Sequence, residues 1–548
     1  MRQYDWYPSV YHKNFREYME YLGSFGDRLA VCWYDRGGQG YEKTYRQLHE
    51  DVAALRKALA ACGLGRCRVA IAGENSYAWL VTFLAVTSGG GVAICVDIDQ
   101  PDETVRHLIS MADSSVIFAS DGMMAICQAM LRGDTGITRV FSLQGEGPDS
   151  FAGLMAQGSQ LPEDAPVGSD SHDTAAIMFT SGTTSNSKAV MLTHGNILNN
   201  AGGAIATVDL GDSIFTGLPF YHAYGLNCSV LCSLIKGAKL TINGDLRTMM
   251  RDLTKSGSKT VFAVPLIMEA LYRGAWAGLK KAGKEQDVEK LIKLYTIGRK
   301  FGLSLGGESR RKVHDLLFGS MELVVCGGAH LNPEISRKLD ALGLCVLQGY
   351  GITECSPLIS VNRNRFWRYD SVGTLMPGYQ IRLENGEILV KGPSVMAGYY
   401  KDPEETALAL QDGWFRTGDL GRIDKDGQIY ITGRIKNLIV LKNGKKISPE
   451  QIEQRIQEIP MVKETMVYGT PSGDDPDDVQ PTVSIYPDPA AVEGMNRIEI
   501  LAALHKEIDR INATLPDYQQ IKMINIRDRE FEKTSSKKPK RNVEENHR

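Results

Sequence analysis

The sequence lacks an excess of charge of either sign. Its 548 residues include 62 lysines and arginines against 65 aspartates and glutamates, which gives a formal net charge of -3. Because the charges of the two signs nearly balance, there is no electrostatic argument for a nucleic-acid-binding protein. Hydrophobic residues make up 43% of the chain and charged residues 23%, which is typical of a soluble globular protein. The length exceeds one ordinary hydrophobic core and predicts at least two domains.

Paired cysteines are also missing. None of the ten cysteines forms a Cys-x-x-Cys pair, and none lies beyond Cys355. Cys228 and Cys232 are four residues apart, but core packing is favoured over a metal site because no second His or Cys pair completes it. We therefore expect buried free thiols and a reducing compartment.

No segment predicts a signal peptide or a membrane-spanning helix. The first six residues have no apolar signal region. The apolar stretch 79–96 is interrupted by Ser88-Gly89-Gly90-Gly91 and predicts a helix, a turn and a buried strand instead of a membrane span. We expect a cytoplasmic protein with, at most, peripheral membrane contact.

The hydrophobic pattern changes along the chain. From Tyr45 to about Gly373, helical patterns such as residues 45–62 alternate with short apolar runs such as 68–72, which predicts α/β structure with largely parallel sheets. Residues 145–173, rich in Gly, Ser, Pro and Asp, predict a surface connection. After Gly373, short runs separated by turns predict a β-rich subdomain.

The last part of the chain mixes predicted strands and helices and is long enough for a small, separate α+β domain. We predict a large N-terminal domain of residues 1–433 and a small mobile C-terminal domain of residues 434–548. Residues 278–312 are rich in lysine and arginine. They predict a solvated helical face. The alternative is a basic surface that binds the anionic part of a thiol cofactor or lipid headgroups.

The strongest chemical signal is the stretch Thr180–Lys188, which reads Thr-Ser-Gly-Thr-Thr-Ser-Asn-Ser-Lys. It follows the apolar run 175–179, so we expect a buried strand that opens into a loop. Hydroxyl and backbone N–H groups can surround a phosphate, and a lysine supplies the opposite charge. No Gly-Lys-Ser/Thr follows at the Walker spacing, so a different nucleotide chemistry is predicted. An ordinary polar loop is the alternative.

Further motifs follow in a fixed order. They are Gly327-Gly328-Ala329, Gly349-Tyr350-Gly351-Ile352-Thr353-Glu354, Trp414-Phe415-Arg416-Thr417-Gly418-Asp419, Gly433-Arg434-Ile435-Lys436-Asn437, and the basic run 533–541. From about Tyr45 to Arg541 this set resembles the adenylate-forming superfamily of acyl-CoA synthetases, peptide-synthetase adenylation domains and beetle luciferases. The resemblance implies that a carboxylic acid is joined to the α-phosphate of ATP and then passed to a thiol, with ATP, Mg²⁺ and coenzyme A as cofactors.

The resemblance also assigns roles to residues. Glu354 binds Mg²⁺, which prefers oxygen ligands, and Thr353 touches the phosphates. Tyr350 offers a flat face to adenine, and Asp419 accepts hydrogen bonds from the ribose with Arg434 nearby. The alternatives are a helix-capping glutamate, a core tyrosine and a turn-capping aspartate. The full cofactor-binding set is Thr180, Ser181, Gly182, Thr183, Thr184, Lys188, Gly327, Gly328, Ala329, Tyr350, Gly351, Asp419, Arg434 and Gly444.

Lys538 aligns with the catalytic lysine of the superfamily, in a segment that usually reads Lys-Thr-Ser-x-Gly-Lys-x-x-Arg. Here Lys537 replaces the glycine, so Lys537 or Lys540 could be mistaken for it, and a solvated basic tail is the alternative. A cation there would stabilise charge that builds up between the carboxylate and the α-phosphate. The resemblance places the interdomain hinge at Lys436 and a thiol tunnel beside Gly444.

The acid-binding region is expected around residues 218–225. Amino-acid-activating relatives carry an aspartate there, and without it an amine would lack a counter-charge, so amino acids are disfavoured. His222 matches a residue near the acyl carboxylate, with a packed histidine as the alternative. Residues 441–450 and 311–318 look most like bacterial and organellar long-chain acyl-CoA synthetases, so a medium- or long-chain fatty acid is the first choice.

Other functions stay open. The acid could be an aryl or another carboxylic acid, and the acceptor could be the phosphopantetheine arm of an acyl carrier protein, because the thiol chemistry is the same. A non-catalytic nucleotide- or acyl-binding relative is disfavoured, because Lys188, Glu354, Asp419 and Lys538 are all present.

Overall fold

The structure, a computed structural model, describes residues 4–162, 168–180, 187–281, 283–300, 307–472, 475–533, 539–541, 543 and 546–547. The chain divides into two compact units. Unit 1 comprises Met1–Ile381, Val390–Phe415 and Asp424–Ile429, and unit 2 comprises Arg382–Leu389, Arg416–Ile423 and Tyr430–Arg548. The predicted domain boundary after residue 433 stays a prediction.

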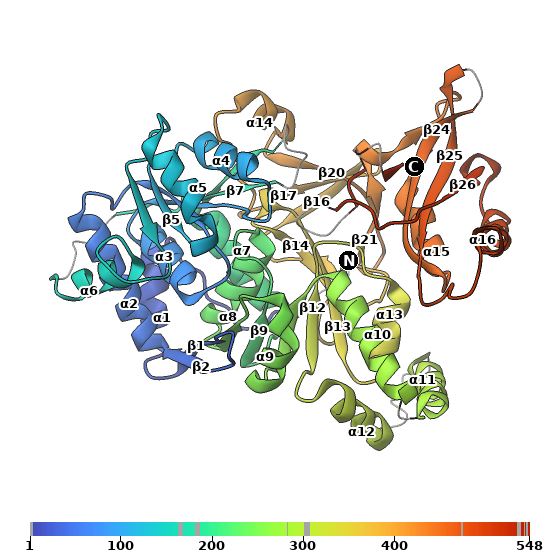
Figure 1. Ribbon diagram of the computed structural model, residues 1–548, viewed down its shortest axis with the longest axis horizontal. Coiled ribbons are helices and arrows are strands. Elements are labelled where there is room, and N and C mark those ends of the chain that lie inside the picture. The colour runs from blue at the N-terminus through green and yellow to red at the C-terminus, as the bar shows by residue number, and fades with distance from the viewer. Residues whose placement is uncertain are drawn as a thin grey trace. The chain divides into compact units, whose positions relative to one another are not determined.

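Within the described residues, the larger sheet of unit 1 has nine strands in the order β15-β14-β13-β12-β11-β9-β10-β1-β2. Figure 1 labels β1, β2, β9, β12, β13 and β14 of this sheet. The strands from β13 to β1 run parallel, whereas β14, β15 and β2 are antiparallel to their neighbours. The bounds are β1 Leu29–Tyr34, β2 Gly40–Thr44, β9 Ser213–Thr216, β10 Lys239–Ile242, β11 Thr260–Ala263, β12 Leu323–Cys326, β13 Cys345–Gly351, β14 Leu358–Val361 and β15 Thr374–Leu375.

A second sheet of unit 1, again counted over the described chain, has seven strands in the order β18-β8-β7-β4-β3-β5-β6. The strands from β7 to β6 are parallel, and β8 and β18 are antiparallel additions at one edge. The bounds are β3 Arg68–Ala72, β4 Val92–Cys95, β5 Val116–Ala119, β6 Arg139–Ser142, β7 Thr174–Phe179, β8 Ala189–Thr193 and β18 Gly398–Tyr399.

Helix α7, His194–Thr207, contacts β7 and β8 of one sheet and β14 of the other. A capping box between Thr193 and Asn196 starts it, and its residues are almost all buried. The other helices of unit 1 are α1 Phe15–Gly23, α2 Tyr45–Ala61, α3 Tyr77–Ser88, α4 Asp102–Met111, α5 Asp121–Arg132, α6 Phe151–Ser159, α8 Cys232–Ile235, α9 Met249–Ser256, α10 Pro265–Lys281, α11 Glu285–Lys300, α12 Gly307–Phe318, α13 Pro333–Ala341 and α14 Pro403–Ala409.

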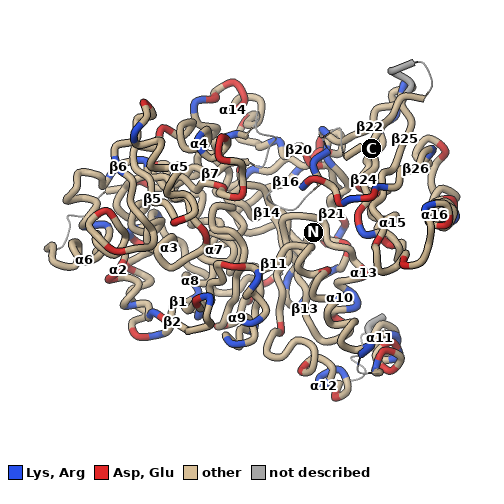
Figure 2. The backbone as a smooth tube through the Cα atoms, in the orientation of Figure 1, with Lys and Arg blue, Asp and Glu red and all other residues tan. Residues whose placement is uncertain are grey.

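The predicted α/β class is confirmed, and so are several local predictions. The amphipathic stretch 45–62 forms α2, and the apolar stretch 79–96 forms α3, a turn and β4. In the described part of the chain, no helix combines the length and apolar character that crossing a membrane requires. Residues 278–312 lie largely on α10, α11 and α12, where Figure 2 shows positions of Asp and Glu among those of Lys and Arg.

The predicted free thiols are confirmed for the core. Cys95, Cys127, Cys228, Cys232, Cys326 and Cys355 are buried and are not joined in disulfides. Burial raises the pKa of Cys228 to about 12, so its thiol stays protonated and behaves as a small apolar group. Among the described residues, no group of three or more His, Cys, Asp and Glu side chains could hold a metal ion by itself.

One local prediction was incomplete. The described residues of the surface connection expected over 145–173 are mostly exposed or partly exposed, but they include helix α6, whose Ser150 side chain caps the Gly153 N–H. Helix α6 packs on α2 so closely that a Cβ at Gly158 would lie 1.8 Å from the Ala54 carbonyl oxygen. Glycine lowers helix propensity but permits this contact, so tertiary packing decides the structure.

We expect Gly158→Ala to lower the free energy of unfolding by about 1–3 kcal/mol, because the new methyl group would overlap α2 backbone. Gly274→Ala is the matched control: it lies inside α10, and its Cβ would meet nothing within 4 Å. That substitution should stabilise by about 0.5–1 kcal/mol. Urea denaturation monitored by circular dichroism measures both; equal effects would contradict the α2–α6 contact.

Unit 2 has its own core of aliphatic side chains, among them Ile452, Val467, Val483 and Leu504. The predicted mixture of strands and helices is confirmed, with bounds β22 Ile439–Val440, β23 Lys446–Ile447, α15 Pro449–Gln457, β24 Val462–Ser472, β25 Asp475–Pro487, α16 Arg497–Asn512 and β26 Met523–Ile526. The β-rich character predicted after Gly373 is confirmed too: β16 Gln380–Glu384, β17 Glu387–Lys391, β19 Leu410–Gln411, β20 Trp414–Ile423 and β21 Ile429–Arg434 form one sheet.

Candidate functional site

The predicted phosphate-binding segment connects β7 to β8, which pair antiparallel with Phe179 opposite Ala189. Thr180 and Lys188 meet at its base. The Thr180 N–H donates to the Lys188 carbonyl at 3.1 Å, and the Lys188 N–H donates to Thr180 Oγ1 at 3.2 Å. The predicted ligands Ser181, Gly182, Thr183 and Thr184 lie outside the described residues.

The Lys188 side chain contacts two residues that follow more than 200 positions later. Its Nζ lies 2.5 Å from Glu405 Oε2 on α14 and 4.7 Å from the centre of the Tyr399 ring on β18. They meet because β18 pairs with β8, with Tyr399 opposite Val190. The Lys188 side chain keeps 34% of its exposure, so an anion could approach the ammonium group.

Glu354 lies on η3, the single helical turn Thr353–Cys355 that follows β13. Its Oε1 accepts a hydrogen bond from the Tyr399 hydroxyl at 3.0 Å, and its carbonyl accepts one from the Met396 N–H at 2.8 Å. Burial, and then the Glu354 carboxylate, raise the pKa of the Tyr399 phenol, which therefore stays a proton donor. Tyr399 thus contacts both predicted ligands, Lys188 and Glu354.

Sequence reasoning missed the residues that position Glu354. The Asn200 side chain, fully buried on α7, donates to the carbonyls of Cys355 at 3.0 Å and Leu358 at 2.8 Å and accepts from the Leu358 N–H at 3.2 Å. Asn227 donates to Asn200 Oδ1 and to the Ser356 carbonyl. An amide inside a helix as apolar as 194–207 was the available signal, because buried polar groups need partners.

The motif around Tyr350 is shaped by strand pairing. Tyr350 is 8% exposed in β13 and pairs with Ser360 of β14. A Cβ at Gly351 would lie 2.2 Å from the Pro357 carbonyl oxygen, so this position requires glycine for a close backbone approach. The adenine-stacking role of Tyr350 stays a prediction.

Gly327, Gly328 and Ala329 follow the carboxyl end of β12, at the edge where ligands of parallel sheets bind. A Cβ at Gly327 would lie 3.2 Å from the Tyr224 ring. The Tyr224 hydroxyl donates to the Val325 carbonyl at 2.8 Å, which fixes the ring beside the glycine. Gly328 has a φ of +83°, a left-handed backbone that favours glycine.

His222 lies half-buried between β9 and η1, Tyr224–Leu231, with its ring edge-on to Tyr221 at 4.8 Å. Asn75 fixes this segment: its Oδ1 accepts from the Phe220 N–H at 2.9 Å, and its Nδ2 donates to the Leu218 carbonyl at 2.8 Å. Asn75 also donates to the Asn243 carbonyl at 3.3 Å. Sequence reasoning did not single out Asn75.

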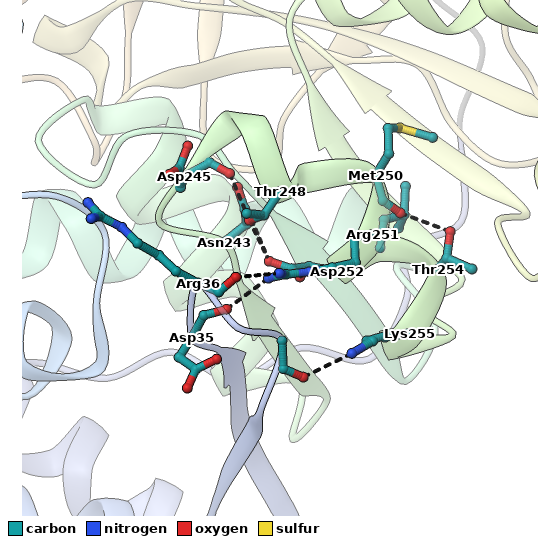
Figure 3. Close-up of polar contacts among 12 residues, drawn as sticks. Asp35, Arg36, Asn243, Asp245, Thr248, Met250, Arg251, Asp252, Thr254 and Lys255 are labelled. Carbon is teal, nitrogen blue, oxygen red and sulfur yellow. Dashed lines mark hydrogen bonds and ion pairs between the residues drawn. The ribbon is translucent and has the colours of Figure 1, made fainter.

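Figure 3 shows the polar cluster beyond Asn243. Buried Asp252 accepts hydrogen bonds from Asn243 Nδ2 at 2.9 Å, Thr248 Oγ1 at 2.8 Å and Arg251 Nε at 2.7 Å. Arg251 and Lys255 donate in turn to carbonyls of the β1–β2 turn. The cluster joins α9 to this turn, and its Asp252 carboxylate holds the Asn243 side chain in place.

In unit 2, the structure brings the predicted ribose ligands together. Asp419, 2% exposed on β20, accepts from Arg434 Nε of β21 at 2.6 Å. The Asp419 N–H donates to Thr417 Oγ1 at 3.0 Å, and Gly418 turns the backbone with a φ of +69°. The ion pair with Arg434 fixes the direction of the Asp419 carboxylate.

The predicted hinge residue Lys436 is exposed on η4, Ile435–Asn437. Gly444 lies in the β22–β23 turn with a φ of +77°, which explains the glycine by backbone conformation, and the space around its absent side chain is open. Lys538, the predicted catalytic lysine, lies outside the described residues. The roles of all three residues stay predictions.

The chemical groups of the candidate site residues in unit 1 match those that bind Mg²⁺ and a triphosphate. Glu354 offers a carboxylate, the kind of oxygen ligand that Mg²⁺ takes from proteins, and Lys188 offers a partly exposed cation. The Tyr399 hydroxyl orients Glu354 as metal-bound groups are commonly oriented by a hydrogen-bonding partner.

Comparison with known proteins finds two family models. A model described as AMP-binding enzyme matches residues 20–400, and a model described as AMP-binding enzyme C-terminal domain matches residues 436–547. Relatives include a long-chain-fatty-acid–CoA ligase of Mycobacterium bovis, 28% identical over 455 residues, with 78% of this chain and 74% of the relative covered. A feruloyl-CoA synthase of an Amycolatopsis species is also 28% identical, over 451 residues, with 79% and 81% covered.

Solved structures share the fold. An anthranilate CoA ligase in complex with anthranoyl-AMP superposes with a TM-score of 0.78 at 18% identity, covering 97% of this chain and 96% of that one. The ATP-bound MatB of Rhodopseudomonas palustris superposes with a TM-score of 0.76 at 24% identity, covering 95% and 96%.

Proposed function

Because this chain belongs to the AMP-binding enzyme family, we propose that it is an ATP-dependent acid–thiol ligase that activates a medium- or long-chain fatty acid as acyl-AMP and transfers the acyl group to coenzyme A. The contacts of Lys188 and Glu354 with one tyrosine, Tyr399, carry the proposal. Through Tyr399, these contacts bring together the Lys188 ammonium group, which can bind a phosphate, and the Glu354 carboxylate, which can bind a metal ion.

Each residue then has a task. Lys188 and Thr180 would hold phosphate oxygens, and Glu354 would hold Mg²⁺, which when bound supplies positive charge to the phosphates. Asp419 would accept hydrogen bonds from the ribose, as acidic residues do in other nucleotide sites. Lys538 would stabilise negative charge between the attacking carboxylate and the α-phosphate. The catalyst needs no nucleophile of its own, because positioning and charge stabilisation suffice for in-line attack.

The acid is the open part of the proposal. A relative named for long-chain fatty acids and one named for an aromatic acid match at the same identity, 28%. The fatty-acid choice rests on the resemblance of residues 441–450 and 311–318 to long-chain acyl-CoA synthetases. An aryl acid is the second candidate, favoured by the feruloyl-CoA synthase relative.

A pyrophosphate-release assay tests the proposal. The full chain is incubated with ATP and Mg²⁺ and with fatty, aryl or amino acids, each with and without coenzyme A. We expect release with fatty acids of medium or long chain and a thioester only when coenzyme A is present. Activity confined to aryl acids would overturn the acid assignment, and no release with any acid would favour a non-catalytic relative.

The thiol acceptor is tested in the same assay. A phosphopantetheine-bearing carrier protein replaces coenzyme A in a parallel set of reactions. We expect coenzyme A to be the better acceptor; preference for the carrier protein would reassign the chain as an acyl-carrier-protein ligase with the same first half-reaction.

Glu405 should compete with ATP for Lys188, because its carboxylate lies 2.5 Å from Nζ. We expect Glu405→Gln to lower the apparent KM for ATP by about two- to fivefold, since a partly exposed ion pair contributes up to about 1 kcal/mol. Glu404→Gln, on the exposed face of the same helix, is the control and should change nothing. A rise in the KM of Glu405→Gln would mean that Glu405 supports ATP binding instead.

A further inference from the structure

Asn227 connects the predicted acid-binding segment to the turn that carries Glu354. It lies on η1, a π-helix that begins inside the acid-binding segment, residues 218–225. The start of η1 is tied to that segment, because the Leu226 N–H donates to the His222 carbonyl at 3.0 Å. π-Helical turns are frequent at functional sites. The position of Asn227 therefore depends on the segment that we expect to hold the acid.

The Asn227 side chain reaches the Glu354 turn directly. It is 2% exposed, and its Nδ2 donates to the Ser356 carbonyl and, at 3.2 Å, to Asn200 Oδ1. Nδ2 also donates to the Ile197 carbonyl at 3.2 Å, so three acceptors share its two hydrogens. Within the described chain, Oδ1 has no hydrogen-bond partner. A side chain without donor hydrogens at this position would lose the whole connection.

The Glu354 turn depends on such contacts because its backbone is strained. Ser356 has a φ of +67°, a left-handed conformation that side chains other than glycine rarely adopt. The Cys355 carbonyl accepts from Asn200 Nδ2 at 3.0 Å and from the Tyr379 hydroxyl at 3.0 Å. Glu354 directly precedes Cys355, so these hydrogen bonds fix the backbone from which its carboxylate extends.

We propose that Asn227 is a positioning residue that couples acid binding to the binding of Mg²⁺ and ATP. An acid bound at residues 218–225 fixes η1, and Asn227 thereby favours the arrangement of the turn in which Glu354 holds the metal. The proposal rests on the proposed function, which assigns the acid to this segment and Mg²⁺ to Glu354. Such coupling is reciprocal, and a typical coupling changes affinity by about 5–150-fold.

Calorimetric titration with Mg²⁺ and the α,β-methylene analogue of ATP measures the coupling without turnover, because this analogue cannot release pyrophosphate. The acid is the one that gives the fastest pyrophosphate release with ATP. We expect saturating acid to lower the Kd of the analogue about fivefold or more in the wild-type chain and less than about twofold in Asn227→Leu. Asn227→Thr keeps one donor hydrogen and should fall between them.

Two control variants separate coupling from a general loss of stability. Asn362→Leu makes the same change at another buried asparagine of unit 1, which is 1% exposed and donates to the Arg368 and Ser371 carbonyls. Tyr379→Phe removes a hydrogen bond to the Glu354 turn that comes from outside η1. Both variants should keep the wild-type ratio of the Kd without acid to the Kd with acid, even where both values rise.

Three results would overturn the proposal: a wild-type Kd that does not respond to the acid, a wild-type ratio in the folded Asn227 variants, or an equal loss of the ratio in Asn362→Leu. Circular dichroism verifies folding, and Asn227→Thr decides the outcome if Asn227→Leu does not fold. The proposed function fails separately, when the wild-type chain binds no analogue with Mg²⁺ or releases no pyrophosphate with any acid.

Discussion

Lys538→Ala is expected to lose acyl-adenylate formation by about 10²–10³-fold, the usual loss when one preorganised electrostatic donor is removed. The same variant should still convert supplied acyl-adenylate and coenzyme A to thioester, because the charge that Lys538 would stabilise belongs to the first half-reaction alone. ATP–pyrophosphate exchange measures the first half, and thioester formation from synthetic acyl-adenylate measures the second.

Three further variants make this result decisive. Lys537→Ala and Lys540→Ala test the irregular tail, because a large loss there with a harmless Lys538→Ala would mean that the alignment is shifted. Lys436→Pro fixes φ at the predicted hinge and should show the reverse pattern, with adenylation kept and thioester formation slowed. Equal impairment of both halves by Lys538→Ala and Lys436→Pro, with folding verified, would contradict alternation between two domain orientations.

Most of the fold could be predicted from local sequence patterns. The run 175–179 ends in turn-forming residues, and the structure has β7 there with Thr180 and Lys188 at the base of the following segment. Such predictions succeed because hydrophobic periodicity and turn chemistry act over a few residues. Helix α6 was not predicted because its glycines lower the helix propensity of the segment. Its close contact with α2 is visible only in three dimensions.

The partners of the site residues were out of reach for a different reason. Glu405 pairs with Lys188 across 217 positions, and Asn200 reaches Cys355 and Leu358 across 155 and 158. These contacts depend on the pairing of β18 with β8 and on the place of α7 between two sheets, which no single-sequence pattern specifies. Asp419 and Arg434 were predicted as neighbours from the resemblance, and their ion pair is formed.

Glu354→Gln is expected to raise the Mg²⁺ concentration needed for half-maximal pyrophosphate exchange by about 10–100-fold, the range seen when a metal site loses a supporting interaction. A neutral amide is a poorer ligand than a carboxylate for a hard cation. The substitution keeps the shape of the side chain, and the amide oxygen can still accept from the Tyr399 hydroxyl, so the fold around η3 should persist.

A Mg²⁺ titration of exchange at saturating ATP and acid makes the measurement, with Glu405→Gln as the control. Glu405 is the second carboxylate of this cluster, and it contacts Lys188 instead of Tyr399. Its variant should keep the wild-type Mg²⁺ requirement while changing the KM for ATP. If Glu354→Gln keeps the wild-type Mg²⁺ requirement, Glu354 is not the metal ligand. If only Glu405→Gln changes the Mg²⁺ requirement, Glu405 is the metal ligand instead, and its ion pair with Lys188 places that lysine beside the metal.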